Sequence, residues 1–302
     1  MGIRCAVIDE IASSISRILQ YMFRGALIVQ LLIGILSQPR ERSEKNLPNP
    51  PAPFERFVVT TDNVPPARIV GAVMPAKTKA KGTLFLCHGW GNRKECFYGW
   101  DWVRRDLGWN IVVFDFREHG QSSHSPMLCT LGFHEIWDVK AVVDYAQRQK
   151  LAEPYTVMGY SLGGSVGMRW AAQDTRVKGV LAVSPFRNGL VGARQFLRAW
   201  VGFSPMKTEA NKNLARMLEI VDLPTDVSKR TDMRLWIMVG QHDIFPESDQ
   251  RAILAGSPAP PQFKKLFVIP NGRHSSLWMW KGDANVASHD QIIRDFLEEC
   301  RK

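Results

Sequence analysis

Cysteine is scarce in this sequence, and its few cysteines follow no regular spacing. The 302-residue chain has five, and no two form a Cys-x-x-Cys pair: Cys5, Cys87, Cys96, Cys129 and Cys300. Disulfide scaffolds and structural zinc sites need denser or more regular cysteines, so we expect neither. The histidines His119, His124 and His134 also lack the spacing of metal ligands. We therefore expect free thiols, with no metal and no cofactor.

Acidic residues are the minority charge. The sequence has 29 Asp and Glu against 39 Lys and Arg, which gives a formal net charge of +10 at pH 7. Such a balance raises the question of an anionic partner. However, the basic residues are scattered, and their clearest clusters, 77–81 and 229–230, are not interleaved with aromatic residues as in a typical nucleic-acid-binding face. We do not expect nucleic-acid binding.

Long apolar runs are missing except near the start of the sequence. Residues 18–36 are apolar apart from Gln20, Arg24 and Gln30. As a helix this run spans about 28 Å, close to the ~30 Å hydrocarbon core of a bilayer. We expect residues 1–36 to form a hydrophobic, partly amphipathic helix that associates the protein with a membrane, followed by a Pro-rich linker at 37–55. The alternatives are a cleaved signal peptide of a secreted protein and a helix packed on the surface of a cytoplasmic one.

From residue 56 to residue 302, short apolar runs alternate with longer amphipathic stretches. The apolar runs predict eight strands, at 57–61, 68–73, 83–87, 111–115, 155–159, 179–183, 235–240 and 265–269. Helical patterns follow most strands from the third onward, for example at 131–150, 162–173 and 287–300. This order predicts an α/β domain with a mainly parallel eight-stranded sheet and helices on both faces. Sheets of this kind place their functional sites at the carboxyl ends of the strands.

Two of these strand ends carry glycine-rich turns. The strand at 155–159 runs into Gly159-Tyr160-Ser161-Leu162-Gly163 and then a helix, the pattern of a nucleophile elbow in which glycines allow a tight turn around an exposed serine. The strand at 83–87 runs into His88-Gly89-Trp90-Gly91. We predict that Ser161 is a nucleophile and that the backbone N–H groups of Trp90 and Leu162 stabilise an oxyanion. His88 itself is expected to shape the loop.

Two later strand ends carry an acid and a histidine. Asp243 follows the strand at 235–240, and His274 follows the strand at 265–269. We predict that His274 takes the proton of Ser161 and that Asp243 orients His274. Rival acids are Glu247 and Asp249, and the rival histidine is His289, but each of these lies in or beside an expected helix rather than directly after a strand.

From about Phe57 to the C-terminus the sequence resembles the α/β-hydrolase fold, in the branch of esterases, lipases and serine aminopeptidases. The resemblance rests on the order Ser161, Asp243, His274, on the serine elbow, and on the segment from Asp115 to Ser122, which is similar to the family's D-x-R-x-x-G-x-S pattern. It implies a serine hydrolase that cleaves a carboxylic ester or a related acyl bond. An acyltransferase, thioesterase or peptidase on the same triad, and a non-catalytic binding protein of the same fold, remain alternatives. Asp115, Arg117 and Ser122 are expected to be structural.

An insertion at about 184–234 separates the sixth and seventh strands. Helical patterns at 191–201 and 208–220 predict a small helical cap over the serine. The insertion is apolar and basic, which suits a small-molecule or lipid-like acyl substrate.

Overall fold

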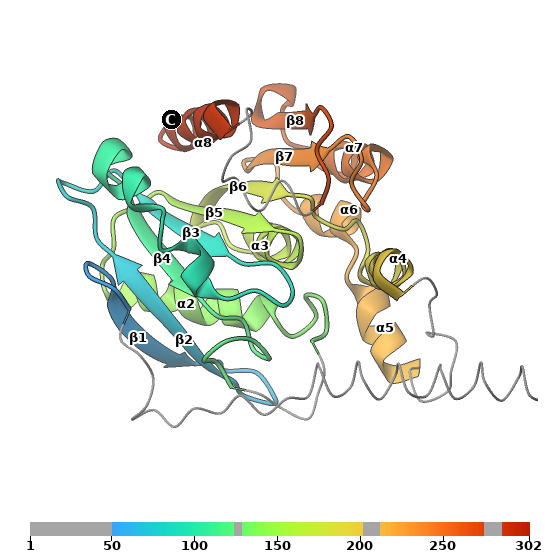
Figure 1. Cartoon of the computed structure of the whole chain (residues 1–302), viewed down its shortest axis with the longest axis horizontal. Coiled ribbons are helices and arrows are strands. Elements are labelled where there is room, and N and C mark those ends of the chain that lie inside the picture. Colours follow the sequence, from blue (N-terminus) through green and yellow to red (C-terminus); the bar gives the residue numbers. More distant parts are fainter. Residues whose placement is uncertain (1–49, 124–128, 202–211, 275–285) are drawn as a thin grey trace, which may run out of the picture. The chain divides into compact units, whose positions relative to one another are not determined.

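The computed structural model describes residues 50–123, 129–201, 212–274 and 286–302. Its centre is an eight-stranded sheet with the order β1-β2-β4-β3-β5-β6-β7-β8 (Figure 1). The strands are β1 (Glu55–Thr60), β2 (Arg68–Met74), β3 (Thr83–Cys87), β4 (Asn110–Phe114), β5 (Tyr155–Tyr160), β6 (Val177–Val183), β7 (Arg234–Gly240) and β8 (Lys264–Ile269). β2 is antiparallel to β1 and β4, and the other pairs are parallel. The predicted sheet is confirmed, with every strand end within two residues of its expected place.

Seven α-helices and three short helical turns are described. The α-helices are α2 (Ile136–Arg148), α3 (Leu162–Ala171), α4 (Gly189–Val201), α5 (Lys212–Ile220), α6 (Leu223–Val227), α7 (Glu247–Gly256) and α8 (Val286–Glu299). The turns are η2 (Lys94–Phe97), η3 (Val103–Leu107) and η5 (Pro261–Phe263).

The helix expected at 131–150 begins later than predicted. The buried Glu135 carboxylate accepts hydrogen bonds from the Thr130 N–H (2.9 Å), the Thr130 hydroxyl (2.8 Å) and the Gly132 N–H (2.7 Å). These contacts hold residues 130–135 as a turn, so α2 begins only at Ile136.

Helices cover both faces of the sheet, as predicted (Figure 1). Because side chains alternate along a strand, Val112 and Phe114 of β4 point to one face, where they belong to a buried cluster that also contains residues of α2, α3 and α7. Ile111 and Val113 point to the opposite face, in a second buried cluster that also contains residues of α8 and of the helical turns η2 and η3. The strands are thus buried on both sides, which explains their continuous apolar runs.

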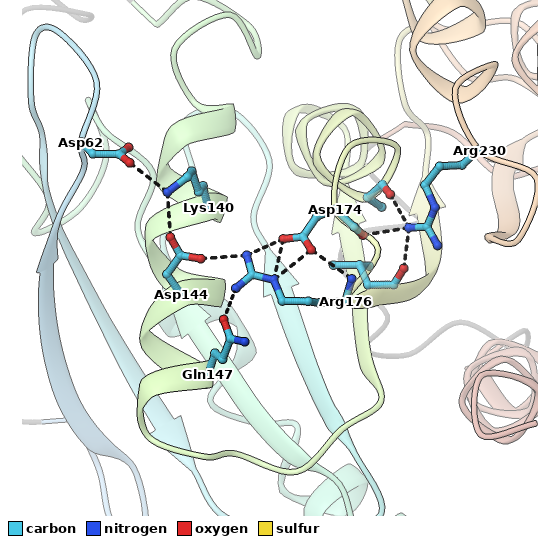
Figure 2. Close-up of polar contacts among 9 residues, drawn as sticks. Asp62, Lys140, Asp144, Gln147, Asp174, Arg176 and Arg230 are labelled. Atoms are coloured by element: carbon cyan, nitrogen blue, oxygen red, sulfur yellow. Dashed lines mark hydrogen bonds and ion pairs between the residues drawn. The ribbon is translucent and has the colours of Figure 1, made fainter.

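A polar network braces the amino-terminal edge of the parallel strands (Figure 2). The Arg176 guanidinium, just before β6, bonds to Asp144 of α2 (2.7 Å) and to Asp174 (2.6 Å). Arg230 donates through Nη1 to three backbone carbonyls of residues 171, 174 and 177 (2.7–2.8 Å). At this edge the charged side chains hold helices and loops together by hydrogen bonds. The candidate site lies at the opposite, carboxyl-terminal edge.

The predicted membrane helix at 1–36 and the first part of the predicted linker, 37–49, lie outside the described residues. In the described end of the linker, the buried Phe54 packs on Tyr98 with ring centroids 4.6 Å apart, and Glu55 is the first residue of β1. Among the helices in the described part of the chain, none combines the length and apolar character needed to cross a bilayer.

Candidate active site

Ser161 occupies a sharp turn between β5 and α3. Its φ and ψ are +50° and −112°, a combination that L-residues avoid and that persists only where the surroundings enforce it. Two backbone hydrogen bonds do so: the Ser161 N–H donates to the Val183 carbonyl of β6 (2.7 Å), and the Ser161 carbonyl accepts from the Ser165 N–H (3.0 Å). The elbow predicted from the sequence is thus held by the neighbouring strand and by the first turn of α3.

Two glycines make the elbow possible by close approach. A Cβ atom on Gly159 would lie 2.2 Å from the Gly163 carbonyl oxygen, and one on Gly163 would lie 2.1 Å from the carbonyl oxygen of Cys87. Both distances are far inside van der Waals contact, so only glycine fits at either position. The start of α3 therefore lies against the end of β3 and against His88, which is two residues before Trp90.

His274 and Asp243 meet Ser161 at the carboxyl ends of the strands. His274 Nε2 lies 3.2 Å from Ser161 Oγ, and His274 Nδ1 lies 2.9 Å from Asp243 Oδ1. The Asp243 side chain is fully buried, and the His274 side chain is 15% exposed. With its Nδ1–H donated to the carboxylate, a neutral His274 presents the lone pair of Nε2 to the serine hydroxyl. The structure brings together three residues that the sequence separates by 82 and 31 positions.

Further contacts fix the acid and the histidine. Asp243 Oδ1 also accepts from the Phe245 N–H (2.9 Å), and Asp243 Oδ2 accepts from the Ser184 hydroxyl (2.6 Å). The His274 ring packs near the rings of Tyr160 and Phe245, with centroid distances of 5.2 Å and 5.0 Å, and the Tyr160 hydroxyl donates to the His274 backbone carbonyl. Sequence analysis missed these supporting residues. Ser184 directly follows a strand end, but a serine before a proline at such a place is an ordinary turn sequence and gives no signal of this contact.

The rival residues have other partners. Glu247 forms an ion pair with Arg251 in α7, and Asp249 accepts a 3.3 Å hydrogen bond from Gln195 of α4. His289 is buried in α8. Of the three candidate acids, Asp243 is the one that the structure places in hydrogen-bond contact with the His274 ring.

The turn that contains Trp90 is fixed by His88. The His88 ring is buried, its Nδ1 lies 2.8 Å from the Gly89 carbonyl, and its Nε2 accepts from the Phe116 N–H (3.1 Å). Burial lowers the pKa of His88 well below 6.5, so the ring stays neutral and shapes the loop as expected. The Leu162 N–H lies in the first turn of α3. The first N–H of this helix that donates to the carbonyl four residues earlier is that of Ser165, so the Leu162 N–H is not used in the helical hydrogen bonds.

The segment from Asp115 to Ser122 is held by structural hydrogen bonds. Lys94 donates to Asp115 through Nζ (2.7 Å), Arg117 pairs with Asp138 (2.7 Å), and the Ser122 hydroxyl donates to the Asp115 carbonyl (2.6 Å). These residues are buried away from solvent and shape the loop, in agreement with the prediction.

Comparisons with known proteins match this architecture. A family model described as the alpha/beta hydrolase fold matches residues 82–218. Among solved structures, the esterase Pf2001 of Pyrococcus furiosus is similar at a TM-score of 0.64 and 18% identity, over 82% of this chain and 93% of that one. The chain has the α/β-hydrolase fold. No curated sequence matches it.

Other structures with this fold extend the comparison. A soluble variant of monoglyceride lipase from Saccharomyces cerevisiae has a TM-score of 0.61 and 17% identity, over 87% of this chain and 99% of that one. The TM-scores show that these proteins share the fold of this chain, and at identities this low the shared fold does not extend to a shared chemistry.

Proposed function

We propose that this protein is a serine hydrolase that cleaves a carboxylic ester, or a related acyl bond, through an acyl-enzyme on Ser161. The observation that carries the proposal is the chain of contacts from Ser161 Oγ to His274 Nε2 (3.2 Å) and from His274 Nδ1 to Asp243 Oδ1 (2.9 Å). A nucleophile next to a base that is itself oriented by an acid is the arrangement that activates a serine. Its location at the strand ends of an α/β-hydrolase fold supports the same conclusion.

The reaction proceeds in two halves. Ser161 Oγ attacks the substrate carbonyl carbon while its proton passes to His274 Nε2, and the N–H groups of Trp90 and Leu162 stabilise the resulting oxyanion. The bond to the leaving group breaks, His274 returns the proton to the leaving alcohol, and the acyl group stays on Ser161. Water then attacks the acyl-enzyme with His274 as base, which releases a carboxylic acid and restores the serine. Asp243 orients His274 and stabilises its protonated form.

The substrate we propose is a small-molecule or lipid-like acyl compound. Phe196 of α4 packs edge-on against Trp90 with ring centroids 4.9 Å apart, which puts an apolar part of the 184–234 insertion beside the proposed oxyanion turn. Arg187, Arg194 and Arg198 of the same insertion are exposed. An apolar wall with positive charge nearby suits an ester that combines an acyl chain with an anionic or polar group. The monoglyceride lipase named above is a precedent, because it has the same fold and is named for a lipid ester.

We also propose that residues 1–36 hold the protein at a membrane, on the basis of their apolar sequence. The test is fractionation of cells that express the full chain. Recovery in the membrane fraction, with release by detergent, is expected. Release without detergent would refute membrane association.

The catalytic proposal is tested by labelling the purified full chain with a fluorophosphonate probe, which reacts with an activated serine. The wild type should label, and Ser161→Ala and His274→Ala should not. A folded wild type that fails to label would overturn the proposal in favour of a non-catalytic binding protein. For a protein that labels, product analysis with and without an alcohol or amine acceptor separates hydrolysis from acyl transfer.

A further inference from the structure

Ser184 stands in an unusual position between the proposed nucleophile and the proposed acid. It directly follows β6, it is fully buried, and its φ is +50°, which a residue with a side chain seldom adopts. The preceding carbonyl, that of Val183, accepts the hydrogen bond from the Ser161 N–H (2.7 Å). The two residues with this strained φ at neighbouring strand ends, Ser161 and Ser184, are therefore linked through one peptide group.

The surroundings hold Ser184 in this conformation. Its N–H donates to the Met238 carbonyl of β7 (2.7 Å). The next residue, Pro185, offers its carbonyl to the side-chain amide of the buried Gln250 in α7 (2.9 Å). A strained backbone that is fixed from both sides is a sign that the side chain is needed where it is.

That side chain ends at Asp243. The Ser184 hydroxyl donates to Asp243 Oδ2 at 2.6 Å, whereas Oδ1 accepts from the Phe245 N–H and lies against His274. The two carboxylate oxygens thus have separate tasks: Oδ1 holds the histidine, and Oδ2 is held by Ser184. A hydrogen bond to a fully buried carboxylate is stronger than one between neutral groups, and its loss leaves a charged oxygen unsatisfied.

We infer that Ser184 is a positioning residue, which fixes the Asp243 carboxylate so that Oδ1 orients His274 toward Ser161. This inference rests on the proposed function. Without the hydroxyl, the carboxylate is free to rotate toward another donor, and the histidine loses its alignment in the step that transfers the proton. Removing the hydroxyl should therefore lower kcat and leave KM nearly unchanged, because Ser184 acts on the reaction and not on substrate binding.

The experiment compares Ser184→Ala and Ser184→Gly with wild type in p-nitrophenyl ester hydrolysis by the full chain. We expect kcat to fall about 10- to 100-fold in both variants, with KM within about 2-fold, as for loss of one hydrogen bond to a charged group. Glycine adopts a φ of +50° without strain, so Ser184→Gly should unfold at a higher urea concentration than Ser184→Ala and still be slow. Wild-type kcat in the glycine variant would overturn the inference, because it would show that the hydroxyl is dispensable.

A matched control and a double variant separate positioning from general loosening. Ser122 is also a buried serine, but its hydroxyl donates to a backbone carbonyl away from the triad, so Ser122→Ala should lose stability and keep kcat within about 2-fold of wild type. In an Asp243→Asn background, Ser184→Ala should cause less than about 3-fold further loss, since both changes disturb one unit. If Ser184→Ala lowered kcat by the same factor in the Asp243→Asn background as in the wild type, the result would contradict the inference. Full turnover in Ser161→Ala would instead refute the proposed function itself.

Discussion

The contact between α3 and β3 provides a sharp test of how this fold builds its site. Substituting Gly163 by alanine would put a Cβ atom 2.1 Å from the Cys87 carbonyl oxygen, 2.5 Å from the Cys87 carbonyl carbon and 2.6 Å from the His88 carbonyl oxygen. An ordinary van der Waals contact, about 3.4 Å or longer, would need at least about 1.3 Å more at the closest of these atoms. All three belong to the backbone, so no side-chain rotation relieves the overlap, and the helix and the strand must move apart.

The expected cost follows from that geometry. Overpacking a core typically costs about 1–3 kcal/mol, and an overlap of backbone on both sides belongs at the upper end or above it. We therefore expect Gly163→Ala to lower the free energy of unfolding by about 3 kcal/mol or more, which corresponds to a urea midpoint lower by at least ~1 M. Separation of the two elements should also pull the Leu162 N–H away from the Trp90 turn. Loss of one oxyanion donor costs roughly 10²- to 10³-fold in kcat, measured under conditions where the variant stays folded.

Gly99 provides the matched control. It is exposed and lacks a positive φ, and a Cβ atom added to it would meet no other atom within 4 Å, so Gly99→Ala should change stability by less than about 0.5 kcal/mol and leave ester hydrolysis intact. The measurements are urea unfolding followed by tryptophan fluorescence and steady-state hydrolysis of a p-nitrophenyl ester. If the Gly163→Ala protein had the same urea midpoint and kcat as the Gly99→Ala protein, the argument would be refuted. The close approach of Gly163 to Cys87 would then not set the distance between the N–H groups of Leu162 and Trp90.

Two further predictions concern buried charge. Lys94→Met removes the ammonium group that lies 2.7 Å from the fully buried Asp115 carboxylate, so we expect a loss of about 3–5 kcal/mol in urea unfolding, partly recovered when Asp115→Asn is added; an unchanged midpoint would contradict it. Burial lowers the pKa of His88 well below 6.5, so the unfolded chain binds a proton that the folded protein does not, and stability falls as the pH drops below about 6.5. Between pH 7.5 and 5.5 the wild type should lose about 1.4 kcal/mol more than His88→Gln, and identical losses would show that His88 does not contribute.

The sheet and the placement of the main site residues could be predicted because they follow from local patterns. Strands buried on both faces leave continuous apolar runs, and the end of each run marks a possible site. The positions of Asp243 and His274 therefore follow from the sequence alone. The elbow is equally predictable, because the close approaches at Gly159 and Gly163 admit only glycine and so leave a motif in the sequence.

The start of α2 and the contacts around the acid could not be predicted, because they depend on residues distant in the chain or on side chains that compete with helix formation. Glutamate is a residue that favours helices. The buried Glu135 carboxylate nevertheless accepts hydrogen bonds from N–H groups of the preceding turn, and the helix begins only after it. Ser184 lies 59 residues from Asp243, and a serine before a proline at a strand end is an ordinary turn sequence.

Ser184 differs from an ordinary turn residue in a combination of properties that is seen only in the folded structure. Its hydroxyl, its positive φ and its burial act together: the strained backbone aims the side chain at Asp243, and burial makes that single hydrogen bond valuable to the carboxylate. A serine on the surface with the same φ would gain nothing that offsets its strain. The three proposed catalytic residues can thus be identified from motifs, whereas a residue proposed to align them is recognised by a strained backbone conformation together with one buried hydrogen bond.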